Sequence, residues 1–389
     1  MIEAWTIAGQ ATGAGLLVSR DGGIQRLFEA TGSCIPRGIA YNGRATKQEN
    51  TPSKSDHPLA EVFGHRKTGV CAVEPSSGES LQAMIAVQQE MFETNRPVAE
   101  RKPVNVASVP QRSPFRYPGG KTWFVPWLRK WLGQKASKPK LLIDPFAGGG
   151  IVSLTAAFED LAESVLMVEI DDEVASVWKT IVLGEGQWLA EQILSFSMTR
   201  ESAAAEIGRE VATLREKAFQ TMLKNRTLHG GILAAGSRFM KNGEAGKGIS
   251  SRWYPATLAK RIRNIALVLE KVTFIHGNAF DTLDAYREDQ DAVFFLDPPY
   301  TAGGKKAGCR LYTHSHLDHD RLFRSCVELH GDFIMTYDNA PEVLDLAKRY
   351  SLQSVPIVMK NTHHMERTEL VVGKDLSWMD EYRAGNHDS

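Results

Sequence analysis

The stretch Leu141-Leu-Ile-Asp-Pro-Phe-Ala-Gly-Gly-Gly150 decides the fold class of this chain. Its leading apolar residues predict a short buried strand. The proline and glycines after Asp144 predict a sharp turn into a helix over residues 151–159. The turn is neither the GxGxxG dinucleotide fingerprint nor a phosphate loop, because no Gly-Lys-Ser/Thr follows it. The stretch therefore indicates an α/β protein with a ligand site at the end of its first strand, and it argues against a dehydrogenase or an NTPase.

Strand and helix patterns alternate downstream of this stretch. Further apolar runs predict strands at residues 165–168, 272–275, 292–296, 333–335, 354–358 and 370–372. Helical patterns lie between several of them, at residues 171–183, 201–224, 257–269 and 317–329. Such alternation predicts a mostly parallel sheet with helices on both faces. Residues 185–263 interrupt the rhythm and are basic, which indicates an inserted helical subdomain.

The tetrapeptide Asp297-Pro298-Pro299-Tyr300 follows the apolar run 292–296. Neither proline can donate an amide hydrogen to a neighbouring strand, so the strand must stop there. An acid and an aromatic are thus held in a rigid corner at the carboxyl end of the strand, where open α/β sheets bind ligands. Glu169 ends an earlier strand, at a position where an acid can accept both hydroxyls of a ribose. Together with the glycine turn, Glu169 indicates a cofactor that contains adenosine.

The charge distribution points to nucleic acid, although the net charge is zero. Residues 101–140 contain ten Lys/Arg and no acid, and residues 224–263 contain nine Lys/Arg and one acid. Such segregation favours a local basic surface that binds nucleic acid. No run of about 18 apolar residues occurs, so we expect no membrane span. The four cysteines are scattered without a CxxC pair, which favours free thiols in a reducing cytoplasm.

The glycine turn after Asp144, the strand-ending Glu169 and the tetrapeptide at 297–300, in this order, resemble the motifs of the Dam-like (D12 class) N6-adenine-specific DNA methyltransferases. Three further segments strengthen the resemblance. Phe115-Arg-Tyr-Pro-Gly-Gly-Lys121 is similar to the amino-terminal cofactor motif of that family, and Glu366-Arg-Thr-Glu-Leu-Val-Val372 to its closing strand. Asn225-Arg-Thr-Leu-His-Gly-Gly231, continued by Arg252-Trp-Tyr254, is similar to its target-recognition region. The resemblance spans residues 112–376.

The resemblance implies a Rossmann-like S-adenosylmethionine-dependent methyltransferase fold with an inserted helical target-recognition subdomain. We expect an amino-terminal extension of unknown role at residues 1–110 and a methyltransferase domain at 111–376. The target-recognition insert occupies 185–263 within that domain, and a carboxyl-terminal tail occupies 377–389. The implied activity is site-specific transfer of a methyl group from S-adenosyl-L-methionine to a flipped-out adenine in double-stranded DNA.

The site residues follow from the same resemblance, position by position. The implied catalytic residues are Asp297, Pro298, Pro299 and Tyr300. The implied cofactor contacts are Tyr117, Lys121, Asp144, Phe146, Gly148, Glu169, Asn278 and Asp297. The implied DNA contacts are Asn225, Arg226, Arg238, Lys241, Lys247, Arg252 and Lys305.

The sequence departs from the family pattern in two places. Residues 117 and 118 are Tyr-Pro where relatives often have Trp-Ala, so an aromatic face is kept on a stiffer turn. Asn278 stands where relatives usually place an Asp for the adenine amino group, and it can hydrogen-bond only as a neutral partner.

The tetrapeptide suits methylation of an amino group. Adenine N6 is a poor nucleophile because its lone pair is delocalised into the ring. The Asp297 carboxylate and the Pro298 carbonyl can accept its hydrogens, which localises the lone pair and stabilises the charge that develops on nitrogen. Tyr300 offers an aromatic face to the base, which must be flipped out of the helix. Cytosine C5 methylation would need a Cys nucleophile, and Pro-Cys does not occur in this chain.

Other readings remain open at the level of sequence. Related amino-methylating enzymes of RNA share the fold and a similar tetrapeptide, and a DNA-binding relative that has lost catalysis is a third alternative. We expect a monomer in the cytoplasm of a bacterium, chromosomal or phage-encoded and associated with the nucleoid. A restriction endonuclease is a candidate partner.

A histidine-rich segment suggests a different chemistry. Thr313-His-Ser-His-Leu-Asp-His319 matches the HxHxDH signature of metallo-β-lactamase-like hydrolases, which bind two zinc ions. That fold needs further His and Asp ligands at later strand ends, and no later histidine has a suitable setting. We therefore predict no metal site, and instead a helix cap at Ser315 or Asp318.

Overall fold

The chain divides into two compact units, residues 1–98 and 99–389. The structure is a computed structural model. In the first unit it describes only the antiparallel strands β1 Leu16–Val18 and β2 Ile24–Arg26. In the second unit it describes residues 103–117, 119–234, 236–243, 246–299, 317–360, 366–380 and 382. The described residues do not test the amino-terminal extension predicted at residues 1–110. The predicted domain limits therefore stay predictions.

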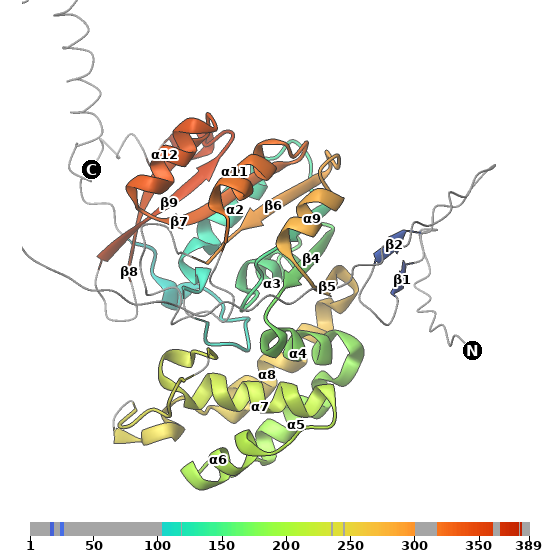
Figure 1. Ribbon diagram of the computed structural model, residues 1–389, viewed down its shortest axis with the longest axis vertical. Helices are drawn as coiled ribbons and strands as arrows, with labels where there is room; N and C mark the ends of the chain where they lie inside the picture. The colour runs from blue at the N-terminus through green and yellow to red at the C-terminus, as the bar shows by residue number, and fades with distance from the viewer. Residues whose placement is uncertain are drawn as a thin grey trace, which may run out of the picture. The chain divides into compact units, whose positions relative to one another are not determined.

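The second unit is built on a sheet whose seven described strands run in the order β5-β4-β3-β6-β7-β9-β8 (Figure 1). The strands are β3 Leu141–Asp144, β4 Ser164–Glu169, β5 Val272–His276, β6 Ala292–Leu296, β7 Asp332–Asp338, β8 Gln353–Lys360 and β9 Glu366–Gly373. Strands β3 to β7 pair in parallel, whereas β9 is antiparallel to both β7 and β8. The predicted mostly parallel sheet is therefore confirmed, with an antiparallel edge that the pattern did not reveal.

Helices cover both faces of this sheet, and for that reason its central strands are apolar on both sides (Figure 1). Successive strand residues enter different cores: Leu142 packs with α2, α3 and α4, whereas Ile143 packs with α9, α11 and α12. The first group of helices is α2 Val125–Gly133, α3 Ile151–Phe158 and α4 Asp172–Thr180. The second group is α9 Ala279–Ala285, α11 His319–Val327 and α12 Pro341–Arg349. No described helix is long and apolar enough to cross a membrane.

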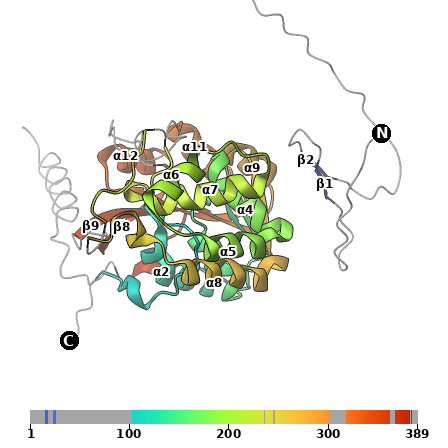
Figure 2. The same cartoon turned by 90° about the horizontal axis from the view of Figure 1, so that it is seen from below.

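The segment predicted as a helical insert lies between α4 and β5 and contains four α-helices among its described residues. They are α5 Gly186–Ser195, α6 Arg200–Gly208, α7 Leu214–Thr227 and α8 Pro255–Ile265. Figure 2 views the molecule from the side of this insert, with α5 to α8 nearest the viewer. Helix α7 packs on α4 and α5 packs on α8, so the insert is continuous with one of the two cores.

The prediction of one long helix over residues 201–224 is wrong. Helices α6 and α7 are separate, because each begins with its own capping box, at Thr199 with Ser202 and at Thr213 with Glu216. The Gln220 side chain also donates to the backbone oxygens of Glu206 and Arg209, at 2.7 and 2.6 Å. It thereby satisfies carbonyls at the end of α6 that a continuous helix would have used internally.

Candidate active site

A large cleft opens at the carboxyl ends of β3, β4, β6 and β7. The strand order reverses between β3 and β6, which is the crevice where open α/β sheets bind ligands. The cleft has a volume of about 2260 Å³, more than the roughly 300–1,000 Å³ of an ordinary small-molecule pocket. All eight predicted cofactor residues line it, namely Tyr117, Lys121, Asp144, Phe146, Gly148, Glu169, Asn278 and Asp297.

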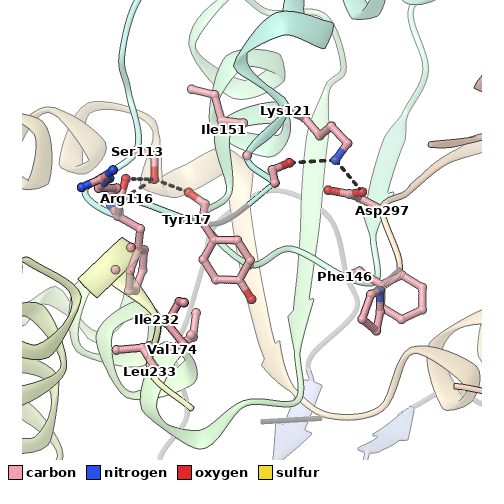
Figure 3. Close-up of a pocket in the computed structure, with 18 of the residues that line it drawn as sticks. Ser113, Arg116, Tyr117, Lys121, Phe146, Ile151, Val174, Ile232, Leu233 and Asp297 are labelled. Atoms are coloured by element: carbon pink, nitrogen blue, oxygen red, sulfur yellow. Dashed lines mark hydrogen bonds and ion pairs between the residues drawn. The ribbon is translucent and has the colours of Figure 1, made fainter. Parts of the chain in front are cut away.

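The glycine turn after β3 needs glycine because Tyr117 lies against it. Gly148 has a φ of +46°, and a Cβ atom there would lie 2.7 Å from Cε1 of Tyr117. At Gly150, with a φ of +65°, a Cβ atom would lie 2.7 Å from the Met167 side chain. Figure 3 shows the Tyr117 ring in the cavity that Ile232 and Leu233 of the insert also line. The aromatic ring and the turn thus form one wall of the cleft.

Glu169 is a buried carboxylate at the end of β4. Its Oε2 accepts a hydrogen bond from the backbone N–H of Gly148 at 2.9 Å, and its Oε1 accepts one from Asp171 at 2.8 Å. Burial raises the pKa of this carboxyl to about 7, although both backbone amides act in the opposite direction. The two oxygens have lone pairs beyond these two bonds, so Glu169 can still accept hydroxyl hydrogens from a ligand.

Asp144 is a carboxylate whose environment is unfavourable unless a ligand is present. It is only 2% exposed, and Ser153 donates to its Oδ2 at 2.6 Å. Its Oδ1 is buried and makes no hydrogen bond to any residue in the described part of the chain. Burial raises the pKa of the carboxyl to about 7, hydrogen bonds from Ser153 and from the backbone N–H of Phe146 lower it in part, and the charges of Asp297 and Glu169 raise it further. A ligand that donates a hydrogen bond could satisfy this buried oxygen at the edge of the cleft.

Asp297 is held in a network of buried polar groups. Lys121 Nζ lies 2.9 Å from Asp297 Oδ1 and 3.6 Å from Glu369 Oε2. The same Nζ donates to the backbone oxygen of Gly119 at 2.7 Å, and Thr336 Oγ1 donates to Asp297 Oδ1 at 3.0 Å. Figure 3 shows Lys121 reaching across to Asp297. The sequence reasoning missed Thr336 and Glu369 as site residues, although Glu369 lies inside the closing-strand motif.

Of the remaining predicted catalytic residues, the structure describes Pro298 and Pro299. Pro299 lines the cleft, and Pro298 is buried directly after Asp297. Tyr300 and the predicted DNA contact Lys305 lie outside the described residues.

Asn278 lines the cleft as the N-cap of α9. Its Oδ1 accepts a hydrogen bond from the backbone N–H of Phe280 at 2.9 Å, and the side chain is exposed. The residue therefore caps the first turn of the helix, and its contact with a cofactor stays a prediction.

Two of the predicted DNA contacts are buried and hold the segment 113–117 in place. Asn225, 1% exposed, accepts from Arg116 N at 2.8 Å and donates to Arg116 O at 2.8 Å and to Gly231 O at 3.0 Å. Arg226 is 7% exposed and donates to Pro114 O, and burial lowers the pKa of its guanidinium to about 10. These two side chains join the insert to the segment that carries Tyr117.

The other predicted DNA contacts face solvent or the cleft. Arg238, Lys241 and Lys247 are exposed, and Arg252 is half-buried. Arg238, Lys241 and Arg252 line the cleft. Their contact with DNA, like that of Asn225 and Arg226, stays a prediction.

The histidine-rich segment forms a helix start in its described part. Asp318 is the N-cap of α11 and accepts from the backbone N–H of Arg321 at 2.9 Å, as expected, whereas residues 313–316 lie outside the described residues. His319 Nδ1 lies 3.1 Å from the hydroxyl of Tyr337, and burial lowers the pKa of the imidazole. No three His, Cys, Asp or Glu side chains gather as a metal site within the described ranges.

Solved structures of methyltransferases are similar to this chain at low sequence identity. The rRNA methyltransferase AviRa from Streptomyces viridochromogenes is 15% identical, with 72% of this chain and 96% of that chain covered at a TM-score of 0.33. An rRNA methylase from Streptococcus thermophilus is 11% identical, with 65% and 97% covered at 0.29. A methyltransferase from Geobacter sulfurreducens is 10% identical, with 78% and 92% covered at 0.31. No curated protein sequence matches the chain.

The profile of one protein family matches more than half of the chain, over residues 117–361. The match runs from Tyr117 through the glycine turn and the insert to Asp297 and beyond, and so covers most of the cleft. It confirms the family expected from the motifs and the Rossmann-like methyltransferase fold that the sheet displays. This chain belongs to the D12 class of N6 adenine-specific DNA methyltransferases.

Proposed function

We propose that this protein transfers a methyl group from S-adenosylmethionine to N6 of a flipped-out adenine at a specific site in double-stranded DNA. The observation that carries the proposal is the position of Asp297. It lies in one cleft with Asp144, Glu169 and the glycine turn, and buried donors hold its carboxylate. Family membership supplies the class of reaction, and the cleft supplies space for a cofactor and a base together.

The residues of the cleft fit S-adenosylmethionine. Asp144 Oδ1, buried and without a protein partner in the described part, suits the cationic amino group of the methionine part. Glu169 would accept the ribose hydroxyls, and Tyr117 and Gly148 would line the space between them. When bound, the cofactor supplies the methyl carbon. The N6 lone pair forms the new carbon–nitrogen bond, the sulfur keeps the electrons of the broken bond, and a proton leaves N6 for solvent.

The protein contributes orientation and fixed acceptors. The Asp297 carboxylate and the Pro298 carbonyl would accept the two N6 hydrogens, which localises the lone pair and stabilises the positive charge that develops. Lys121 and Thr336 hold the carboxylate before the substrate arrives, so little reorganisation is needed during the reaction. Tyr300 would provide the face on which the flipped base rests.

Expression in a host that lacks DNA methylation tests the proposed function, with sequencing reads that detect modified bases. We expect N6-methyladenine at a single sequence motif and none with an Asp297→Asn variant. Methylation of rRNA or tRNA without methylation of duplex DNA would instead identify an RNA methyltransferase. Cofactor binding with no methyl transfer to any DNA would identify a relative that has lost catalysis.

Asn278→Asp is expected to tighten cofactor binding about fivefold, because a charged acceptor strengthens a hydrogen bond to the adenine amino group by about 1 kcal/mol. Aspartate is also an N-cap residue, so the start of α9 is retained. Isothermal titration with S-adenosylmethionine measures the change. Asn339→Asp, which adds the same charge elsewhere on the cleft wall, is the matched control. Equal affinities in wild type and Asn278→Asp would show that this side chain does not contact the cofactor.

The insert has a second groove that suits the DNA backbone. It has a volume of about 610 Å³, and the described residues that line it include Arg200, Lys224, Arg238 and Lys241 but no acid. Arg238 and Lys241 also line the main cleft, so the two surfaces are continuous. The Arg200 guanidinium lies 5.4 Å from the centre of the Phe239 ring and donates to Met240 O at 3.1 Å. We infer that a strand leaving the cleft follows this groove.

Arg200→Ala is expected to weaken DNA binding uniformly across sequences and to reduce the slope of log K against log salt by about 0.9, the value for one phosphate contact. Fluorescence anisotropy over a series of salt concentrations measures the slope. Arg215→Ala is the matched control, because Arg215 also stacks on an aromatic ring of the insert, Trp188, but pairs with Glu185 at 3.2 Å. Identical slopes for the two variants would remove Arg200 from the DNA path.

A further inference from the structure

Thr336 belongs to none of the motifs that mark the site, yet its hydroxyl reaches the reacting centre. The residue lies in β7 beside the end of β6 and is 0% exposed. Its Oγ1 donates to Asp297 Oδ1 at 3.0 Å, and its distance to the backbone oxygen of Leu296 is 3.5 Å. The carboxylate is therefore the nearer acceptor. A hydrogen bond to a charged acceptor is also about twice as strong as one to a neutral acceptor.

Two donors from separate elements act on the same oxygen of Asp297. Lys121 Nζ comes from the 3-10 helix Lys121–Phe124, at 2.9 Å, and the Thr336 hydroxyl comes from β7. The terminal torsion of an aspartate is broad, so a carboxylate does not fix its own plane. Lysine reaches Asp297 through a flexible four-carbon stem, whereas threonine is stiff at χ1 because it is β-branched. Thr336 is thus the more rigid of the two supports.

We propose that Thr336 is a positioning residue for methyl transfer, whose hydroxyl holds the Asp297 carboxylate in the orientation that accepts a hydrogen of the substrate amino group. This inference rests on the proposed function, in which Asp297 is the acceptor. Thr336 itself touches neither cofactor nor base in this scheme. Its loss lets the carboxylate turn, and a misplacement of about 1 Å costs roughly 100-fold in rate.

The test compares two substitutions that differ in the hydroxyl. Thr336→Val keeps the shape and the branching of the side chain, and we expect a decrease of roughly 10- to 100-fold in the single-turnover rate of methyl transfer. The affinity for DNA should not change. Thr336→Ser restores the hydroxyl and should return the rate to within a few-fold of wild type. Thr180→Val is the matched control, because Thr180 is 1% exposed and its hydroxyl donates only to a backbone oxygen, of Ser176, at 2.8 Å.

The outcomes separate this inference from the proposed function. An active wild type with an unchanged Thr336→Val rate, or a Thr336→Ser variant as slow as Thr336→Val, overturns the positioning role alone. A wild type that binds DNA and cofactor but transfers no methyl group overturns the proposed function and this inference with it. If Thr336→Val does not fold, Thr336→Ala is compared with Thr336→Ser by the same criteria.

Discussion

Asp297→Asn is expected to decrease methyl transfer about 1,000-fold or more and to leave the protein folded. The substitution removes the negative charge that stabilises the developing positive charge on N6, and loss of one such preorganised group typically costs about 100- to 1,000-fold. It also puts an amide N–H₂ where one substrate hydrogen needs an acceptor. The fold should survive because the asparagine oxygen can still accept from Lys121 and Thr336, and because Glu369 remains close to Lys121.

Single-turnover incorporation of labelled methyl into DNA measures this effect, since it excludes product release. Cofactor affinity and melting temperature are recorded in parallel to separate chemistry from folding. Asp291→Asn is the control at the other end of the same strand, where Asp291 forms an exposed ion pair with Lys140 at 2.6 Å. A rate for Asp297→Asn within about tenfold of wild type would be incompatible with the role of this carboxylate as an essential acceptor.

Asp144→Asn is expected to stabilise the protein without cofactor and to abolish most of its cofactor affinity. Burial raises the pKa of this carboxyl from 3.8 to about 7, which corresponds to roughly 4 kcal/mol of destabilisation once it is ionised in both states. An asparagine avoids that cost, although its buried N–H₂ would lack a partner at about 1–3 kcal/mol. We therefore expect the free energy of unfolding to rise by about 1–3 kcal/mol near pH 8.

The pH dependence of this gain has a definite sign. The folded-state pKa is raised, so the wild-type penalty is absent below the ordinary pKa of 3.8 and complete above about 7. The advantage of Asp144→Asn should therefore shrink as the pH falls from about 8 to about 5. Wild-type cofactor affinity should also fall over the same interval, because protonation removes the charge that attracts the amino group.

Denaturant titrations at both pH values and calorimetric titration with S-adenosylmethionine measure the two effects. Asp160→Asn is the control, because the pKa of this exposed carboxyl is shifted in the opposite direction. Lys138 and Lys271 lower this pKa to about 2. The Asp160→Asn variant should not gain stability at either pH. An Asp144→Asn variant that is less stable than wild type at the higher pH would show that the buried charge does not destabilise the protein. A variant that binds the cofactor normally would show that Asp144 does not bind its amino group.

Local patterns predicted the residues that end the strands. Two prolines after Asp297 stop β6, and a proline with three glycines stops β3 after Asp144, so both acids must lie at strand ends. Parallel strands end at the same edge of a sheet, so these residues and Glu169 meet in one cleft. The separation of α6 from α7 was missed, although Thr213 with Glu216 matches the capping-box pattern that marks a helix start.

The direction and burial of side chains in the insert could not be predicted from the sequence. Asn225 and Arg226 lie in a basic, polar stretch that predicts exposed DNA contacts, but both turn inward to the backbone of residues 114 and 116. Those partners are more than a hundred positions away in the chain. The pattern of residues along a helix shows which side is polar, and it does not show whether another segment covers that side.

The sequence by itself determined the α/β class, the family and the acids at the ends of β3, β4 and β6, because each depends on residues that are neighbours along the chain. Only the tertiary structure decided which groups surround Asp297. Lys121, Thr336 and Glu369 come from three elements, and the sheet order that sets β7 beside β6 and β9 beside β7 brings them together. That order arises from long-range packing of helices on both faces of the sheet, and no local pattern encodes it.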